Sequence, residues 1–175
     1  MRQTAKEYPD KIAIYYEDEK IAYSQLDQDV DNLAQALLNS GLEPQGRVGI
    51  VLGNDANFIR SYFAVLRAGG VAVLLNPASK GEELKYFIED SGIKHIITSM
   101  DTLPVITGIL DQVPPIKQLI VAGGTKDELI TPLEDILSQK ASPVEVNVSE
   151  GDIDLLVHLR NNRQTQRGFI NPPQF

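Results

Sequence analysis

The stretch RVGIVLGNDANFIRSYFAVLRAGGVAVLLNP, residues 47–77, decides the fold. Val48–Leu52 is a short apolar run rich in β-branched residues, which predicts a buried strand. Asp55 is a favourable N-cap for a helix, and Gly69-Gly70 would end that helix because glycine adopts the left-handed cap readily. Val71–Leu75 predicts a second buried strand. Strand, helix and strand within about thirty residues form a βαβ unit, which normally joins parallel strands by a right-handed crossover. The apolar residues at helical spacing are Phe58, Tyr62, Phe63, Val65 and Leu66.

The residues before this unit predict a hairpin and a long helix. Ile12–Tyr16 and Lys20–Tyr23 read as two strands around a polar turn, and Thr4–Tyr8 reads as the tail of a helix that stops before Pro9. Ser24 is the expected N-cap of the next helix. The apolar face of that helix would be Leu26, Val30, Leu33, Ala34, Ala36 and Leu37.

After Pro77 the alternation of helix and strand repeats. Ser79 is a candidate cap for a helix over Gly81–Ser91, which Gly92 would end. Leu84, Phe87 and Ile88 are its expected inward residues. Further strands are predicted at Lys94–Thr98, Gln118–Val121 and Ile153–Val157, further helices at Leu103–Leu110 and Ile130–Leu137, and a loop at Ser138–Asp152. Strands alternating with helices predict an α/β domain with a mainly parallel sheet and flanking helices.

Composition narrows the classes of partner and location. The chain has 175 residues, 24 acidic and 16 basic, with a net charge of −8 and no cysteine. Scattered negative charge argues against nucleic acid as a partner, since phosphates attract basic patches. The N-terminus lacks the apolar run of a signal peptide, and no stretch is long enough for a transmembrane segment. We therefore expect a soluble, cytoplasmic protein.

Single residues give no catalytic or metal-binding set. His95 falls inside a predicted strand, where a structural role is favoured over a catalytic one. Asn54 and Asn76 follow strands, where α/β proteins place ligand contacts, but capping of a helix or turn is favoured. Gly123-Gly124 lacks the glycines and lysine of a phosphate loop and reads as a turn. His158 is given no role.

The character of the chain changes at His158. Residues 158–175, HLRNNRQTQRGFINPPQF, are rich in asparagine, glutamine and arginine and hold no acidic residue. A buried strand thus runs into a polar, basic segment without periodicity. We predict two parts: residues 1–157, an N-terminal subdomain, and residues 158–175, a disordered or non-native tail.

Four segments in order resemble the N-terminal part of the adenylate-forming (AMP-binding) enzymes, which include acyl-CoA synthetases, luciferases and peptide-synthetase adenylation domains. They are YPDKIAI (8–14), IAYSQLDQDVDNLAQALLNSGL (21–42), GRVGIVLGNDANFIRSYFAVLRAGGVAVLLNP (46–77) and EELKYFIEDSGIKHIIT (82–98). The segments AGGVAVLLNP (68–77) and EELKYFIEDSG (82–92) look most like a long-chain fatty acid–CoA ligase. The resemblance spans residues 4–157.

In that family, a strand like Ile153–Val157 leads into a phosphate loop, Y-T-S-G-T-T-G-K-P-K-G. Glycines there let backbone N–H groups approach the ATP phosphates, and lysine supplies charge. The loop would follow Val157, but HLRNNR stands in its place, so the ATP-binding residues of this chain are unknown.

The genetic code offers an origin for the tail. Codons exist for His158–Phe175 such that a reading frame advanced by one nucleotide gives I-S-G-T-T-G-K-P-K-G-V-L-L-T-H-R-N. Codon choice leaves mainly the middle base of each new codon free, so a chance match over the whole tail is improbable. We hypothesise that the tail is the frame-shifted remnant of the ATP loop.

The resemblance implies a function for a full-length relative. Such an enzyme would use ATP and Mg²⁺ to convert a fatty acid or other carboxylic acid into an acyl-adenylate and would pass the acyl group to coenzyme A. This chain would be a truncated form, inactive alone, and its exposed sheet edges would favour self-association. Two alternatives stay open: a stand-alone α/β nucleotide-binding or protein-interaction module, and a fragment that refits onto a separately made C-terminal piece.

Overall fold

A computed structural model describes residues 1–146, 155–161 and 164–170, and from residue 157 on it describes the backbone. At its centre lie β3 (Arg47–Val51), α3 (Ala56–Arg67) and β4 (Val71–Leu74). The two strands pair in parallel. Asp55 caps α3 by accepting a hydrogen bond from the Phe58 backbone N–H at 2.8 Å. The predicted βαβ unit and its cap are therefore confirmed.

The other elements surround this unit. In chain order they are α1 (Arg2–Glu7), β1 (Ile12–Tyr16), β2 (Glu19–Ala22), α2 (Tyr23–Asn39), α4 (Gly81–Ser91), β5 (His95–Ser99), α5 (Leu103–Thr107), the 3-10 turn η1 (Leu110–Gln112), β6 (Gln118–Ala122), β7 (Ile130–Pro132), α6 (Leu133–Leu137), β8 (Leu155–Asn161) and β9 (Gln164–Ile170). β1 and β2 form the predicted hairpin. The main sheet has the order β7-β6-β5-β3-β4-β8-β9, in which only β8 and β9 are antiparallel neighbours. The α/β fold with a mainly parallel sheet is thus confirmed.

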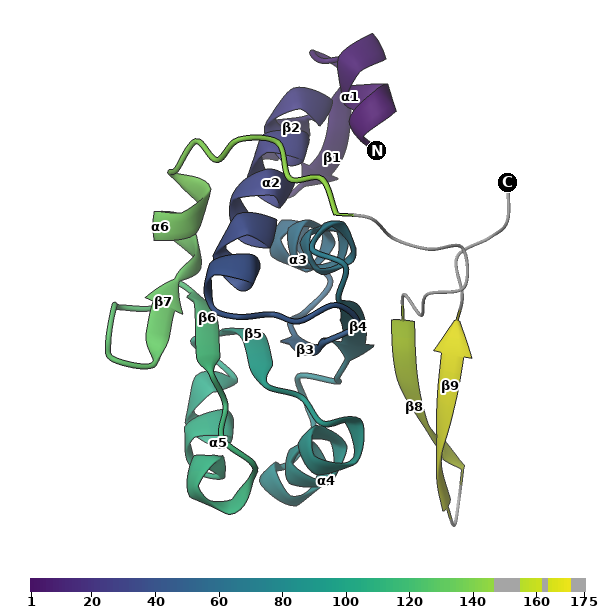
Figure 1. Ribbon diagram of the computed structural model, residues 1–175, viewed down its shortest axis with the longest axis vertical. Coiled ribbons are helices and arrows are strands. Elements are labelled where there is room, and N and C mark those ends of the chain that lie inside the picture. Colours follow the sequence, from purple (N-terminus) through teal and green to yellow (C-terminus); the bar gives the residue numbers. More distant parts are fainter. Residues whose placement is uncertain (147–154, 162–163, 171–175) are drawn as a thin grey trace.

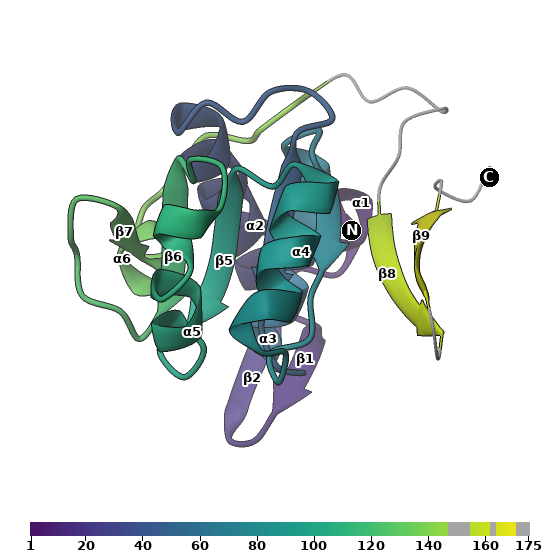
Figure 2. The same ribbon diagram turned by 90° about the horizontal axis from the view of Figure 1, so that it is seen from below.

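Helices cover the sheet on two faces. Helices α2, α3 and α6 lie on one face, and α4 and α5 lie on the other (Figures 1 and 2). Successive strand residues point to opposite faces, so Ile50 and Ile97 pack under α2 and α3 while Val51 and Ile96 pack under α4. Among the described residues, no helix combines the length and the apolar character needed to cross a bilayer.

Two predicted caps are wrong. Helix α2 begins two residues earlier than expected, with Ala22 as its N-cap and no side-chain hydrogen bond at the cap. The Ser24 backbone N–H donates to the Pro9 carbonyl instead. Helix α4 begins after Lys80, also without a side-chain cap, so Ser79 does not cap it. At α2 the competing contact comes from Pro9, fifteen residues before Ser24, which a local motif cannot reveal. The end of α4 is as predicted, because Gly92 adopts the left-handed conformation with φ 67°.

The segment Ile130–Leu137 is not one helix. Residues 130–132 form β7, which extends the sheet edge by pairing with β6, and α6 begins only at Leu133. The Leu119 N–H donates to the Leu129 carbonyl at 3.0 Å and anchors this edge. Pairing with β6 makes residues 130–132 a strand and not part of a helix. The helix predicted over Leu103–Leu110 is likewise shorter, ending at Thr107.

The end of the chain contains paired strands. β8 begins at Leu155 and pairs in parallel with β4, continuing to Asn161, and β9 pairs with it in antiparallel fashion. Regular structure in residues 158–161 and 164–170 differs from the disordered tail predicted from composition. Pairing with β4 ends at Val157, and pairing with β9 extends β8 beyond it. Ile153 and Asp154 of the predicted strand, and residues 147–152 of the predicted loop, lie outside the described residues. The frame-shift origin of the tail stays a prediction.

Candidate functional site

The carboxyl edge of the sheet is where the family resemblance would place the ATP loop, directly after Val157. Strands β3, β4 and β8 are adjacent, so the positions that follow them meet at this edge. Asn54 follows β3, Asn76 follows β4, and Val157 lies opposite Leu74. The topology therefore brings the two predicted asparagines to the same edge as the point where an ATP loop would follow β8.

The two asparagines differ in their local roles. Asn76 holds a turn, since its side-chain oxygen accepts a hydrogen bond from the Ala78 backbone N–H at 2.9 Å. The capping interpretation is thus confirmed for Asn76. For Asn54 it is wrong, because Asp55 is the residue that caps α3. Asn54 itself is exposed beside that cap.

Two buried threonine hydroxyls lie at the same edge of the sheet, near the end of β5. Thr98, one residue before the end of β5, is fully buried, and its hydroxyl donates to the Val51 carbonyl at 3.2 Å. Thr102 lies in hydrogen-bond contact with Thr98 and is also buried. These threonines tie the turn after β5 to the end of β3. Sequence reasoning missed them, although hydroxyl residues four positions apart after a buried strand were a visible signal.

The backbone after Val157 does not fit a phosphate loop. Residues 158–161 continue β8 as an extended strand and contain no glycine, whereas phosphate binding needs N–H groups that converge in a turn. In the described part of the chain, no cluster of three or more His, Cys, Asp or Glu residues could hold a metal ion. Within residues 155–161, the carboxyl edge thus has an extended strand where the family would place a phosphate loop.

Several cavities lie elsewhere, and two of them bear on the predicted residues and on the surface of the chain. One, of about 530 Å³, is mainly apolar and lies between α1, β1 and α3. The other, of about 240 Å³, lies at the amino edge of the sheet, bordered by residues 41–47 and by the starts of β5 and β6. His95 forms part of the second cavity. It is 2 % exposed, and its Nε2 lies 3.3 Å from the Ser40 carbonyl oxygen.

The contacts of His95 set its protonation. Burial lowers its pKa, the Ser40 carbonyl acts in the opposite direction, and the charges of Lys117 and Lys94 lower it further. His95 is therefore neutral at neutral pH. Gly123-Gly124 forms the predicted turn, with Gly123 at φ 72°.

Comparison with known proteins identifies the family of the chain. A family described as AMP-binding enzyme matches residues 1–163. A salicylyl-CoA synthase / salicylate adenylyltransferase from a Streptomyces species is 29 % identical over 165 residues, covering 87 % of this chain and 30 % of that protein.

Solved structures show the same fold. An anthranilate CoA ligase, AuaEII, in complex with anthranoyl-AMP superimposes with a TM-score of 0.89 at 20 % identity, covering 97 % of this chain and 32 % of that one. A putative long-chain-fatty-acid CoA ligase from Rhodopseudomonas palustris superimposes with a TM-score of 0.85 at 19 % identity, covering 97 % and 42 %. The chain thus spans less than half the length of these similar proteins.

Proposed function

This chain belongs to the AMP-binding enzyme family, and on that premise we propose that its parent enzyme activates a carboxylic acid with ATP. By parent enzyme we mean the full-length protein of which this chain is the N-terminal part. The acid would attack the α-phosphate of ATP to give an acyl-adenylate and pyrophosphate, and coenzyme A would then accept the acyl group. Mg²⁺ would offset the phosphate charge. The observation that carries this proposal is the family match over residues 1–163.

A fatty acid is the proposed substrate class. The support is the resemblance of residues 68–77 and 82–92 to long-chain fatty acid–CoA ligases. Aromatic acids are the competing substrate class, because one relative that aligns with 87 % of this chain is a salicylyl-CoA synthase / salicylate adenylyltransferase. The described residues include no part of an acid-binding pocket that we can assign, so the choice rests on the sequence.

The role of this chain follows from its tail. We propose that residues 158–175 are the frame-shifted remnant of the ATP loop and that the 175-residue chain forms no acyl-adenylate. Residues 1–157 would then be the N-terminal subdomain of the parent enzyme, with the apolar cavity and sheet edges available for self-association.

Sequencing the gene beyond the codon of Phe175, followed by repair of the frame, tests the proposal. Removal of the first nucleotide of the His158 codon should give an open frame that spells Ser-Gly-Thr-Thr-Gly-Lys. The repaired protein should exchange pyrophosphate into ATP in the presence of palmitate, while the unrepaired chain should not. A panel of octanoate, palmitate, salicylate and an amino acid then ranks the substrate classes.

Each outcome decides something different. Exchange with salicylate but not palmitate would retain the family function and overturn the fatty-acid class. A shifted frame without the loop would overturn the frame-shift proposal, and a stand-alone nucleotide-binding or protein-interaction module would then be tested by nucleotide-dependent thermal shift.

A further inference from the structure

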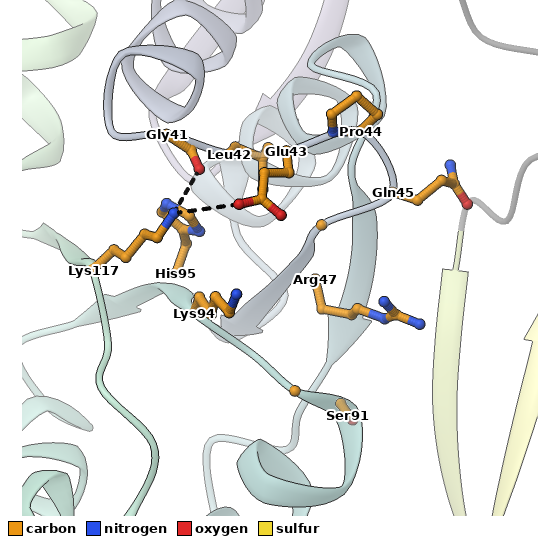
Figure 3. A pocket seen from close by; sticks show the side chains of 12 residues that line it. Gly41, Leu42, Glu43, Pro44, Gln45, Arg47, Ser91, Lys94, His95 and Lys117 are labelled. Atoms are coloured by element: carbon orange, nitrogen blue, oxygen red, sulfur yellow. Dashed lines mark hydrogen bonds and ion pairs between the residues drawn. The ribbon is translucent and has the colours of Figure 1, made fainter.

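Three cationic residues stand side by side at the amino edge of the sheet. Arg47 opens β3, Lys94 directly precedes β5, and Lys117 directly precedes β6. These strands are neighbours in the order β6-β5-β3. Backbone hydrogen bonds continue the pairing through the three cations, from the Lys94 N–H to the Arg47 carbonyl at 3.5 Å and from the Lys117 N–H to the Lys94 carbonyl at 2.7 Å. We call Arg47, Lys94 and Lys117 the cation row (Figure 3).

The cation row is poorly compensated by protein charges. Neighbouring strands lie about 4.8 Å apart, and like charges directly opposite one another destabilise a sheet. Glu43 lies 3.9 Å from the Lys117 ammonium and is itself largely exposed. Within the described residues, the side chains of Arg47 and Lys94 have no hydrogen-bond or ion-pair partner. This concentration of positive charge stands out in a chain whose net charge is −8.

Helix ends explain only part of the cation row. Helices α2 and α4 end at this edge, and the negative end of a helix dipole attracts cations. Lys117 serves this purpose, since its ammonium donates to the Gly41 carbonyl, just past the end of α2, at 3.0 Å. In the part of the chain that the structure describes, Arg47 and Lys94 make no such contact. Two of the three cations are therefore available to a ligand.

The cation row borders a cavity of about 240 Å³ that the loop 41–46 and the end of α4 complete. Figure 3 shows Lys117 and Arg47 on different sides of this cavity, with Lys94 between them. His95 lies beneath, and its buried Nδ1 has no hydrogen-bond partner among the described residues. An anion here would screen the lysines from the imidazole, so His95 is a natural reporter of binding.

We propose that the cation row binds the phosphate group of a small molecule in this cavity, at the edge of the sheet opposite the one where the ATP loop of the family follows β8. Phosphate oxygens suit this set of donors, because the arginine fork binds two oxygens at once and lysines act as point charges. The three positions span two strand spacings, about 10 Å, which favours a diphosphate over a single phosphate.

Calorimetric titration of the 175-residue chain with inorganic pyrophosphate and with inorganic phosphate, without Mg²⁺ or a carboxylic acid, tests the proposal. We expect pyrophosphate to bind more tightly. The double variant R47Q/K94Q, which removes the two cations available to a ligand, should weaken binding at least about tenfold, as expected for the loss of charge-assisted hydrogen bonds. The matched variant K126Q/K140Q removes the same charge outside the cavity and should change the affinity less than about twofold. Equal losses in both variants would overturn the proposal.

Two further measurements locate the ligand. The imidazole NMR signals of His95 should shift on addition of pyrophosphate, and signals that do not move would overturn the proposal. Without ligand, Lys94→Gln should raise Tm by relieving repulsion in the cation row, whereas a fall in Tm would show that Lys94 stabilises the fold and would overturn the proposal. Because neither measurement requires adenylation, their outcome is independent of the family function.

Discussion

The helices on the two faces of the sheet bury different chemistry. Under α2 and α3, Arg60 is only 8 % exposed, and its Nε lies 2.8 Å from the buried carboxylate of Asp29. Arg67 pairs with Asp31 in the same layer at 3.2 Å. Under α4 and α5 the buried contacts are mainly apolar, with Leu84, Ile88 and Ile106 among them, beside the hydroxyl pair of Thr98 and Thr102.

The polar layer also fixes a segment distant in sequence. The Asn32 amide donates to the Leu137 and Gln139 carbonyls at 3.1 and 2.8 Å and accepts from the Ala141 N–H at 2.8 Å. Asp31 accepts from the Val144 N–H at 2.9 Å. The polar groups of α2 thus hold the last residue of α6 and the segment 138–144 against the helix.

The contrast between the two helix layers shows how apolar and polar contacts position a helix on the sheet. Apolar contacts are non-directional, so the α4 layer is held by area and shape. Buried polar contacts require defined partners, so the α2 layer is held in one alignment and is sensitive to the loss of any partner. Arg60 illustrates this: burial acts to lower its pKa, but hydrogen bonds to Glu19 and Asp29 raise it above its ordinary value.

The largest expected effect comes from breaking the buried pair. Arg60→Ala leaves the Asp29 carboxylate without a countercharge and should lower the free energy of unfolding by about 3–5 kcal/mol. Urea denaturation followed by circular dichroism measures it. The double variant D29L/R60M should lie much closer to the original chain, since it removes both charges. A loss in the double variant as large as in R60A would show that packing, rather than charge, holds this layer.

The apolar layer should respond to volume. Leu84→Ala removes a fully buried side chain from α4 and should lower the free energy of unfolding by about 2–5 kcal/mol, through lost burial and the cavity that remains. The same denaturation measurement applies. Glu89→Ala, an exposed change on the same helix, should stay within about 0.5 kcal/mol. If L84A and E89A behave alike, α4 is not anchored by its apolar face.

Acid should weaken the face that carries His95. Because the pKa of His95 is lowered in the folded chain, the unfolded chain binds a proton first as the pH falls below about 6.5. Stability should therefore decrease below that pH, with a slope of up to about 1.4 kcal/mol per pH unit from this residue. His95→Gln should reduce the slope between pH 6.5 and 5. An unchanged slope would assign the acid sensitivity to other groups.

The smallest expected effect is at the cap of α3. Asp55→Ala removes the bond to the Phe58 N–H and should cost about 1 kcal/mol, measured as a change in urea midpoint. Asp55→Ser keeps an oxygen that can accept this bond and should recover most of the loss. Because α4 begins without a side-chain cap, Lys80→Ala should have little effect at the corresponding position. A large change in urea midpoint for K80A would mean that the Lys80 side chain stabilises the start of α4, as Asp55 does for α3.

Local signals carried the prediction of the central elements. The βαβ unit over residues 47–77, the cap at Asp55 and the left-handed Gly92 each depend on residues within a few positions of one another. The same holds for the hairpin β1–β2. Local signals failed at Ser24 and at residues 130–132, where Pro9 and β6 provide competing hydrogen bonds from elsewhere in the chain.

The sequence by itself determined the family, the alternation of strands and helices, and the absence of a phosphate loop after Val157. Each of these features can be recognised from short segments of sequence and from the order in which they follow one another along the chain. Only the tertiary structure decided that Arg47, Lys94 and Lys117 stand in one row and that Arg60 meets Asp29. Both arrangements join residues far apart in the chain, and strand order and helix packing, which set those distances, depend on the whole core.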